Sequence, residues 1–233
     1  MFTRSEHLYD AVYAFKDYAA EAGRLHELIE ERRPGATTLL DVACGTGKHL
    51  EQLARWYEVD GLDLDPAMLE LTRARVPAAA LHAADMTRFD LDRKFDVVVC
   101  LFSSIGYAGT LEGVHRAVAA IAGHLEPGGL LVVEPWISPD VWEDGNPRLV
   151  VVDEPDLKVA RMNVARRVDR LSILDFTYLV GTPDGVEVFT EHHEAVLLTD
   201  DEYRAAFTAA GLAVEYDAEG LIGRGLYLGR SPA

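Results

Sequence analysis

The sequence predicts an α/β fold, a doubly wound and mostly parallel sheet of seven strands with an added antiparallel β meander. Between residues 37 and 136, apolar strand-like runs alternate with helical segments, which is typical of βαβ units. Between residues 148 and 198, polar and apolar residues alternate along four runs, which is typical of antiparallel strands. A chain of 233 residues has room for one domain with such an elaboration.

Residues 37–136 are predicted to form the parallel core. Apolar runs predict strands at 38–43, 59–64, 79–83, 95–101 and 130–134, and the segments between them predict helices at 48–56, 66–75 and 111–125. Pro66 suits the first turn of its helix, and Asp65 suits the N-cap before it. Gly128 and Gly129 are expected to make the turn into the fifth strand.

Three flanking segments complete the predicted domain. Residues 1–36 form a helical cover, with one helix at 9–32 across an end of the sheet. Residues 148–198 form the β insertion, with strands at 149–153, 158–168, 171–180 and 186–197, and serve as a lid or as a dimer surface. Residues 199–233 close the fold with a helix at 199–210, opened by a capping box of Thr199 and Glu202, and with strands at 213–216 and 226–229.

The composition limits the classes of function. A net charge of −17 repels phosphate backbones and no basic stripe overrides it, so we expect no nucleic-acid partner. There is no apolar run of membrane-spanning length and no secretory signal, so we expect a cytoplasmic protein without a membrane partner. Cys44 and Cys100 lie in apolar runs and are expected to be buried thiols. His192 and His193 are adjacent on a predicted strand and face opposite ways, so no metal site is expected.

A glycine-rich turn between the first strand and the first core helix indicates a nucleotide-type cofactor. Gly45 and Gly47 let the backbone approach a ligand, and Asp63 ends the next strand at the distance expected for a carboxylate that binds a ribose diol. NAD is disfavoured because the third small residue of a dinucleotide loop is replaced by Leu50. A phosphate-binding P-loop is rejected because Val42 and His49 stand where it needs glycine and a hydroxyl residue.

The run 41–47, the strand-end Asp63 and the pair Asp85-Met86 resemble the class I S-adenosylmethionine-dependent methyltransferases, which have a Rossmann-like sheet. This resemblance implies S-adenosyl-L-methionine as cofactor, with Gly45 and Gly47 under its methionine portion and Asp63 on its ribose. Asp85 and Met86 would frame the adenine, although Asp85 is also read as a solvated carboxylate and Asp41 as a structural hydrogen-bond partner of the loop. The implied cofactor-binding residues are Asp41, Ala43, Gly45, Thr46, Gly47, Asp63, Leu64, Met68, Asp85, Met86 and Leu101.

Further motifs, at 16–18, 86–89, 100–106, 132–136, 207–211 and 223–226, resemble those of the nucleotide-sugar N,N-dimethyltransferases that make amino sugars such as desosamine and mycaminose. The resemblance implies N,N-dimethylation of a dTDP-linked amino-deoxysugar in antibiotic biosynthesis. The implied substrate-binding residues are Tyr18, Phe102, Ser103, Ser104, Trp136 and Arg224.

The residues suggest what some of these positions do. Trp136 and Tyr18 are able to stack on a thymine ring, and Arg224 to pair with a diphosphate, while core packing for Trp136 and a surface ion pair for Arg224 stay open. Tyr107 stands where the resembling enzymes have histidine. A protonated amine has no lone pair, so Tyr107, Glu134 and bulk water are the candidate proton acceptors.

Two other classes of function remain open at this point. A small-molecule O-methyltransferase would need a positioned base, because a hydroxyl is far less acidic than an ammonium. A non-catalytic cofactor-binding module is disfavoured because it has no need of both a glycine loop and an aromatic pocket. Tyr9 and Tyr13 are assigned to packing, and the protein is expected to act on a small molecule and to form a possible homodimer.

Overall fold

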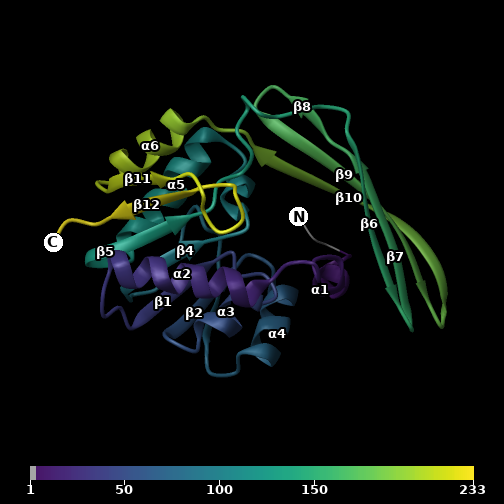
Figure 1. The fold of residues 1–233 in the computed structure, drawn as a ribbon, viewed down its shortest axis with the longest axis horizontal. Coiled ribbons are helices and arrows are strands. Elements are labelled where there is room, and N and C mark those ends of the chain that lie inside the picture. The colour runs from purple at the N-terminus through teal and green to yellow at the C-terminus, as the bar shows by residue number, and fades with distance from the viewer. Residues whose placement is uncertain (1–3) are drawn as a thin grey trace.

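The computed structural model describes residues 4–233 and contains two separate β-sheets that lie side by side (Figure 1). A seven-stranded sheet covered by helices forms one half of the molecule, and a five-stranded antiparallel sheet extends from it. The predicted fold class is therefore confirmed. Residues 1–3 of the expected N-terminal cover lie outside the described part of the chain.

The seven-stranded sheet is mostly parallel. Its strand order is β11-β12-β5-β4-β1-β2-β3, in which β12 runs antiparallel to both of its neighbours. The chain reverses its direction across the sheet between β1 and β4, and the loops after these two strands meet there. The strands are β1 (Thr38–Val42), β2 (Glu58–Asp63), β3 (Ala80–Ala83), β4 (Phe95–Cys100), β5 (Leu125–Val133), β11 (Ala213–Asp217) and β12 (Leu226–Arg230).

Helices cover both faces of this sheet, which explains why its central strands are apolar throughout. On β4, Val98 and Cys100 pack with α5 and α6, whereas Val97 and Val99 pack with α2 and α3 on the opposite face. The helices are α2 (Tyr18–Arg32), α3 (Lys48–Leu53), α4 (Pro66–Arg75), α5 (Leu111–Gly123) and α6 (Asp200–Ala209).

Local capping sets several helix boundaries. The Asp65 side chain accepts from the Ala67 amide at 2.9 Å at the start of α4, and the expected capping box of Thr199 and Glu202 opens α6. The expectation of one helix over 9–32 was wrong, because Asp17 caps α2 and a non-helical segment precedes it. The chain forms η1 (Glu6–Leu8) and a single turn α1 (Tyr9–Val12) before that break.

The core differs from the expectation at one turn and contains one additional element. Gly128 and Gly129 do not make a turn before the fifth strand but lie inside β5, where the pairing with β4 shifts register. Gly128 has a positive φ of 68°, which favours glycine. A 3₁₀ helix, η2 (Ser104–Ala108), also follows β4, in a segment for which no element was predicted.

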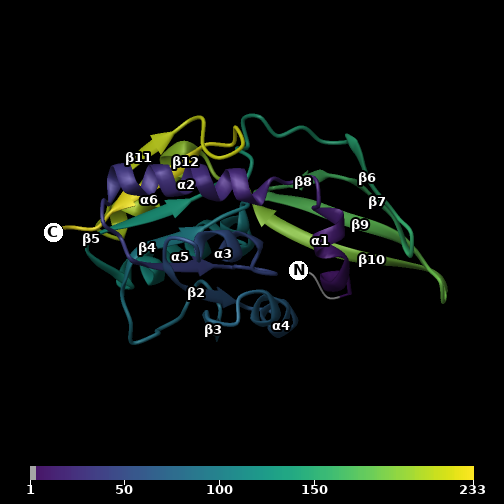
Figure 2. The same cartoon turned by 60° about the horizontal axis from the view of Figure 1, so that its bottom comes forward.

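The antiparallel sheet curves around the N-terminal segment. Its order is β10-β9-β7-β6, and the short β8 pairs with β9. Figure 2 shows α1 against the inner face of this sheet, where Leu8 and Val12 pack with Phe176, Tyr178 and Phe189. The strands are β6 (Pro147–Glu154), β7 (Leu157–Val164), β8 (Arg166–Val168), β9 (Leu171–Thr182) and β10 (Gly185–Val196).

The cysteines and the histidine pair singled out in the sequence lie within residues 4–233. Cys44 and Cys100 are both free thiols; Cys100 is buried as expected, whereas Cys44 is only partly buried. His193 is fully buried while His192 is exposed, so the pair faces opposite ways, and no cluster of three His, Cys, Asp or Glu side chains forms a candidate metal site in this range. In the same range no helix combines the length and apolar character needed to cross a membrane.

Candidate functional site

Two adjoining cavities lie at the carboxyl ends of the central parallel strands, where ligands bind in open α/β sheets. The larger one has a volume of about 340 Å³ and the smaller one about 30 Å³. Four residues line both cavities: Tyr9, Ala43, Gly45 and Ser104. The two cavities therefore form one continuous candidate site beside the glycine loop.

The loop after β1 is built from residues with left-handed backbone. Ala43, Gly45 and Gly47 have φ angles of 60°, 57° and 75°. A Cβ on Gly45 would meet no protein atom within 4 Å, so glycine here leaves open space at the cavity wall. Gly47 has another role, because a Cβ there would lie 2.7 Å from Cγ2 of Thr72, and it lines neither cavity. Its expected place under the methionine portion of a cofactor stays a prediction.

Asp63 links the ends of β1 and β2. Its Oδ2 accepts from the Gly45 amide at 2.8 Å and its Oδ1 accepts from the Asp65 amide at 2.9 Å. Burial raises the pKa of this carboxyl above its ordinary value. Asp63 also lines the large cavity, so it presents a polar group to a ligand while holding the glycine loop.

The small cavity contains two polar groups without a salt-bridge partner among the described residues. Asp41 is buried, and burial followed by the nearby Asp63 raises its pKa to about 8. The hydroxyl of Tyr18 is buried without a hydrogen-bond partner in the described part of the chain. Both residues line this cavity, so a polar ligand group could satisfy them there.

A buried ion cluster stands behind the small cavity. Nζ of Lys16 lies 2.7 Å from Oε1 of Glu21, and Nε2 of His49 lies 2.8 Å from Oε2 of the same carboxylate. The Lys16 ammonium also lies 4.0 Å from the centroid of the Phe102 ring. The cluster fixes the start of α2, and with it Tyr18, against the glycine loop.

The far end of the large cavity combines a carboxylate with thioether side chains. Oδ1 of Asp85 accepts from the amide of Thr87 at 2.9 Å and from its hydroxyl at 2.8 Å. The Thr87 amide bond is the main cause that holds the pKa of Asp85 below its ordinary value. Met68 and Met86 line the same end, which makes it suitable for a flat, partly apolar ring.

The loop after β4 is held in a conformation that non-glycine residues rarely adopt. Phe102 and Ser103 have φ angles of 51° and 62°. Oε2 of Glu134 accepts from the Phe102 amide at 2.7 Å, and the Ser103 hydroxyl donates to the Pro135 carbonyl at 2.7 Å. Nη1 of Arg224 donates to Oγ of Ser103 at 3.1 Å, which brings the exposed Arg224 to this loop.

Glu134 and Trp136 do not line either cavity. The Glu134 side chain is fully buried, and burial raises its pKa. Its Oε2 holds the Phe102 amide, its Oε1 is buried without a hydrogen-bond partner in the described part of the chain, and its role as a proton acceptor stays a prediction. Nε1 of Trp136 donates to Oγ of Ser172 at 2.7 Å, and the ring packs beside Gly106. This contact joins the two sheets and does not leave the ring facing a cavity.

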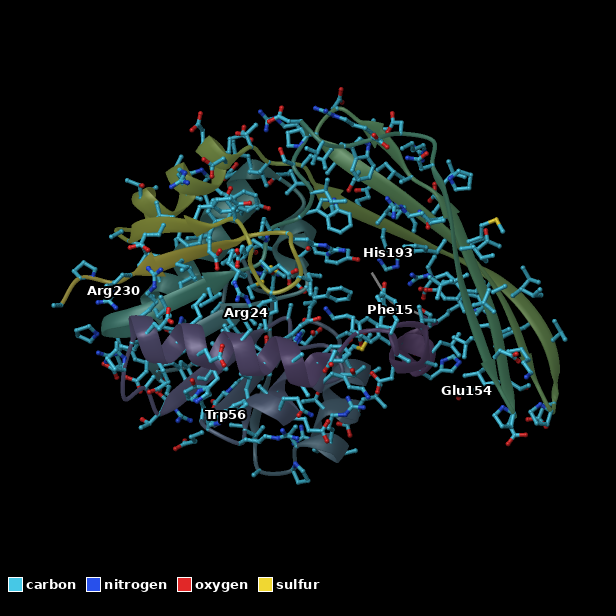
Figure 3. All side chains as sticks on the ribbon, in the orientation of Figure 1. Phe15, Arg24, Trp56, Glu154, His193 and Arg230 are labelled. Carbon is cyan, nitrogen blue, oxygen red and sulfur yellow. The ribbon has the colours of Figure 1, made fainter. Side chains whose placement is uncertain are left out.

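Tyr107 lines the large cavity and contacts the antiparallel sheet. Its hydroxyl lies 2.9 Å from Nδ1 of His193 on β10. Figure 3 shows His193 between the two sheets, on the side of β10 that faces the parallel core. Burial is the main cause that raises the pKa of the Tyr107 hydroxyl well above its ordinary value. Tyr107 is therefore a neutral phenol at the wall of the site.

The structure brings most of the predicted site residues together. Among the expected cofactor-binding residues, these line one or both cavities: Asp41, Ala43, Gly45, Thr46, Asp63, Leu64, Met68, Asp85, Met86 and Leu101. Of the expected substrate-binding and catalytic residues, Tyr18, Phe102, Ser104 and Tyr107 do so. Ser103 and Arg224 lie behind Phe102, next to the cavity wall.

Sequence reasoning missed three residues in or beside the site. Tyr9 was assigned to packing, yet it lines both cavities, and Tyr13, one helical turn later, stacks at right angles to Phe102. The spacing of these two tyrosines on one helix face was the available signal. His193 shares the inner face of β10 with Phe189 and Glu191, which the alternation along the strand would have indicated.

Comparison with known proteins places the chain among methyltransferases. Residues 39–129 match the family model described as a methyltransferase domain. The chain is 46% identical over 226 residues to dTDP-3-amino-3,4,6-trideoxy-alpha-D-glucopyranose N,N-dimethyltransferase of Streptomyces venezuelae, covering 95% of each sequence. It is 40% identical to dTDP-4-amino-2,3,4,6-tetradeoxy-D-glucose N,N-dimethyltransferase of Saccharopolyspora spinosa, covering 95% of this chain and 90% of that one.

A solved structure shows the same similarity in three dimensions. SAM-bound CalS10, an amino pentose methyltransferase of Micromonospora echinaspora involved in calicheamicin biosynthesis, has a TM-score of 0.88 and is 41% identical. The match covers 99% of this chain and 97% of that one. The similarity therefore includes the antiparallel sheet as well as the cofactor-binding core.

The raised pKa of Asp41 predicts a pH dependence of stability. In the folded protein Asp41 stays protonated up to about pH 8, whereas its unfolded pKa is 3.8, so its contribution to the free energy of unfolding falls as pH rises between these values. Asp41→Asn removes this dependence and should flatten the decline between pH 5 and pH 8 by at least about 1 kcal/mol, given about 1.4 kcal/mol per pKa unit. Urea denaturation of the cofactor-free wild type and of Asp41→Asn, at pH 5 and at pH 8, measures this change in the free energy of unfolding.

Asp85→Asn is the matched control. The pKa of Asp85 is lowered in the folded protein, so its contribution to stability changes only below about pH 4 and leaves the interval from pH 5 to pH 8 unaffected. An equal decline in the wild type and in Asp41→Asn would show that Asp41 is ionised at neutral pH.

Proposed function

Because the chain belongs to the family of S-adenosylmethionine-dependent sugar N,N-dimethyltransferases, we propose that it transfers two methyl groups to the amino group of a dTDP-linked amino-deoxysugar. One observation carries the proposal: Asp63, Asp85 and Tyr107 line the same cavity. The curated relatives act on sugars that carry the amino group at position 3 or position 4, and both positions belong to the proposed substrate class.

The residues of the site fit S-adenosylmethionine. Asp63 would hold the ribose hydroxyls, and the Met86 end of the large cavity would hold the adenine. The open space beside Gly45 leads to Asp41 and the Tyr18 hydroxyl, which would bind the ammonium and carboxylate of the methionine portion. The bound cofactor supplies an electrophilic methyl group on sulfur, so the protein mainly has to orient the acceptor.

The acceptor side of the site favours an amine over a hydroxyl. Tyr107 keeps its proton because its pKa is raised, and the Glu134 carboxylate lies outside the cavities. A neutral amine needs no base to attack, and its excess proton passes to solvent afterwards. A hydroxyl acceptor would need a base that these residues do not supply, which disfavours the alternative of a small-molecule O-methyltransferase.

We propose that Arg224 binds the diphosphate of the nucleotide. Its guanidinium lies 5.8 Å from the centroid of the Phe102 ring and hydrogen-bonds Ser103, while the side chain remains exposed. A guanidinium in this position can pair with a diphosphate in spite of the net charge of −17. Because the same net charge repels phosphate backbones, we propose no nucleic-acid partner. Both reactants are charged and do not cross a bilayer unaided, so we propose that the enzyme works in the cytoplasm.

The outer face of the antiparallel sheet supports a homodimer. Val151, Ala160, Leu179 and Val188 are register partners across β6, β7, β9 and β10 and form one apolar row. Leu149 and Met162 begin the next row, and Val186 extends the patch along β10. Val188 is 64% exposed. Because the face is apolar and exposed, a second copy related by a two-fold axis would bury the same surface on both chains.

Loss of the Asp63 carboxylate should weaken cofactor binding. Asp63→Ala removes the hydrogen-bond acceptor for the ribose and releases the Gly45 amide, so the Kd for S-adenosylmethionine should rise by roughly tenfold or more. Isothermal titration calorimetry measures the change, and NAD should show no binding to either protein. An unchanged Kd in Asp63→Ala would remove this residue from the cofactor site.

The substrate class is tested by mass spectrometry. We expect the wild-type enzyme with S-adenosylmethionine to add two methyl masses to a dTDP-linked 3-amino or 4-amino sugar and to use the free amino sugar far less well. Arg224→Ala should raise KM for the sugar nucleotide by about tenfold and leave cofactor affinity alone. Arg230→Ala is the control, because Arg230 lies at the opposite end of the parallel sheet in Figure 3. Equal use of the free sugar would contradict binding through the diphosphate, and methylation of oxygen would contradict the function.

The dimer is tested by placing a charge in the apolar row. Val188→Glu should convert the protein from dimer to monomer in size-exclusion chromatography with light scattering, because the interface would bury an unpaired carboxylate. Val141→Glu is the control, since Val141 is 69% exposed in the segment between β5 and β6, outside the antiparallel sheet. A monomeric wild type, or a dimeric Val188→Glu, would contradict the assignment.

A further inference from the structure

Three side chains run in a line from the large cavity into the antiparallel sheet. The Tyr107 hydroxyl contacts Nδ1 of His193 at 2.9 Å, and Nε2 of His193 lies 3.7 Å from Oε2 of Glu191. His193 is fully buried and Glu191 is 4% exposed. The three groups follow one another as carboxylate, imidazole and phenol. Where the hydrogen atom lies on one group therefore constrains where it lies on its neighbour.

Glu191 is held as an ionised acceptor. Its Oε1 accepts from the amides of Arg4 and Ser5 at 2.7 and 3.0 Å, and its Oε2 accepts from the Ser5 hydroxyl at 2.5 Å. An ionised carboxylate only accepts hydrogen bonds, so these three donors hold the side chain in position and favour its ionised form. The negative end of the line is therefore set by the backbone of the N-terminal segment.

The environment of His193 selects one neutral form of the imidazole. Burial lowers its pKa to about 4, so it carries a single N–H at neutral pH. The carboxylate on the Nε2 side favours the hydrogen on Nε2 and leaves the lone pair on Nδ1. Nδ1 then accepts the O–H of Tyr107. The phenol uses its only hydrogen in this bond and presents only oxygen lone pairs to the cavity.

We propose that His193 is a positioning residue that makes the Tyr107 oxygen a hydrogen-bond acceptor for the substrate amine, and that this acceptor slows a third methyl transfer relative to the first two. The inference rests on the proposed function and names what limits its outcome. Tyr107 lines the cavity that Asp63 and Asp85 also line, and the proposal places its oxygen within reach of a bound acceptor.

The chemistry of the amine explains the limit. A neutral primary or secondary amine donates an N–H to the Tyr107 oxygen and keeps its lone pair free. That lone pair forms the new N–C bond while the S–C bond breaks and its electron pair stays on sulfur; the nitrogen then gives one proton to solvent. A tertiary amine carries a hydrogen only when its lone pair is protonated. It cannot be held by an N–H and attack at the same time.

The opposite tautomer would have the opposite effect. If Nδ1 of His193 carried the hydrogen, the imidazole would donate to Tyr107, and the phenol hydrogen would be free to bond the lone pair of the amine. The nucleophile would then be blocked at its reacting atom. The direction of one hydrogen bond, between His193 and Tyr107, therefore decides whether the site supports attack on the methyl group.

A spectroscopic measurement tests the tautomer without any turnover. The imidazole ¹⁵N shifts of the wild-type protein at pH 7 should show His193 as the neutral Nε2–H form, and its signals among those of the eight histidines are identified by their loss in His193→Leu. A charged imidazole or the Nδ1–H form would overturn the proposal. This result does not depend on whether the substrate class is correct.

A double-mutant cycle tests whether His193 acts through Tyr107. His193→Leu should lower kcat by about tenfold with KM for the sugar nucleotide little changed, and His193→Asn, which restores an acceptor at the Nδ1 position, should recover most of it. Tyr107→Phe should keep kcat within about tenfold of the wild type, and adding His193→Leu should cost nothing more. The exposed neighbour provides the control variant His192→Leu. An equal loss in both backgrounds would mean a merely structural role.

The methyl count tests the limit itself. Supplied with the dimethylated sugar nucleotide, the wild-type enzyme should add a third methyl about tenfold more slowly than it adds the second, and Tyr107→Phe should lose most of this difference in rate, measured by mass spectrometry. An unchanged ratio of the two rates in a Tyr107→Phe enzyme that still dimethylates would overturn the limit. Failure of the wild-type enzyme to methylate any amino sugar would instead defeat the proposed function and leave the tautomer result standing.

Discussion

The site depends on carboxylates that hold the loop of a neighbouring strand. Asp63 at the end of β2 accepts from the Gly45 amide in the loop after β1, and Glu134 after β5 accepts from the Phe102 amide in the loop after β4. Hydrogen bonds to a charged acceptor contribute about 1.5 to 3 kcal/mol each, which is enough to offset the cost of left-handed backbone in these loops. Parallel strands supply both carboxylates at the same edge, so one arrangement shapes two walls of the site.

The third wall comes from outside the parallel sheet. The inner face of the antiparallel sheet brings His193 to Tyr107, and Trp136 to Ser172, so the segment after β5 and the helix η2 are both fixed by the insertion. The N-terminal segment fills the remaining space, with Tyr9 on the cavity wall. The cofactor side of the site is thus built from local turns, whereas the acceptor side is built from contacts between distant segments.

This division explains what the sequence could and could not predict. The glycine loop and Asp63 are close in sequence and their roles follow from strand and turn patterns, so their meeting was predictable. Glu134 and Trp136 were expected at the ligand because they follow a strand, but their partners, Phe102 and Ser172, are set by tertiary contacts that a strand pattern does not encode. Gly47 has the left-handed backbone expected of the glycine loop. Glycine is needed there because Thr72 of α4 approaches so closely that a Cβ would collide with it.

The position of β12 has a consequence for how the protein is made. This strand comes late in the chain but lies inside the sheet, between β5 and β11, and its residues Leu226 and Leu228 are buried in the core. The antiparallel hairpins, whose partners are neighbours in sequence, can form as soon as they leave the ribosome. The parallel core stays open along β5 until residues 226–230 have emerged. Throughout the synthesis of the insertion, β5 therefore lacks the strand that pairs with its outer edge.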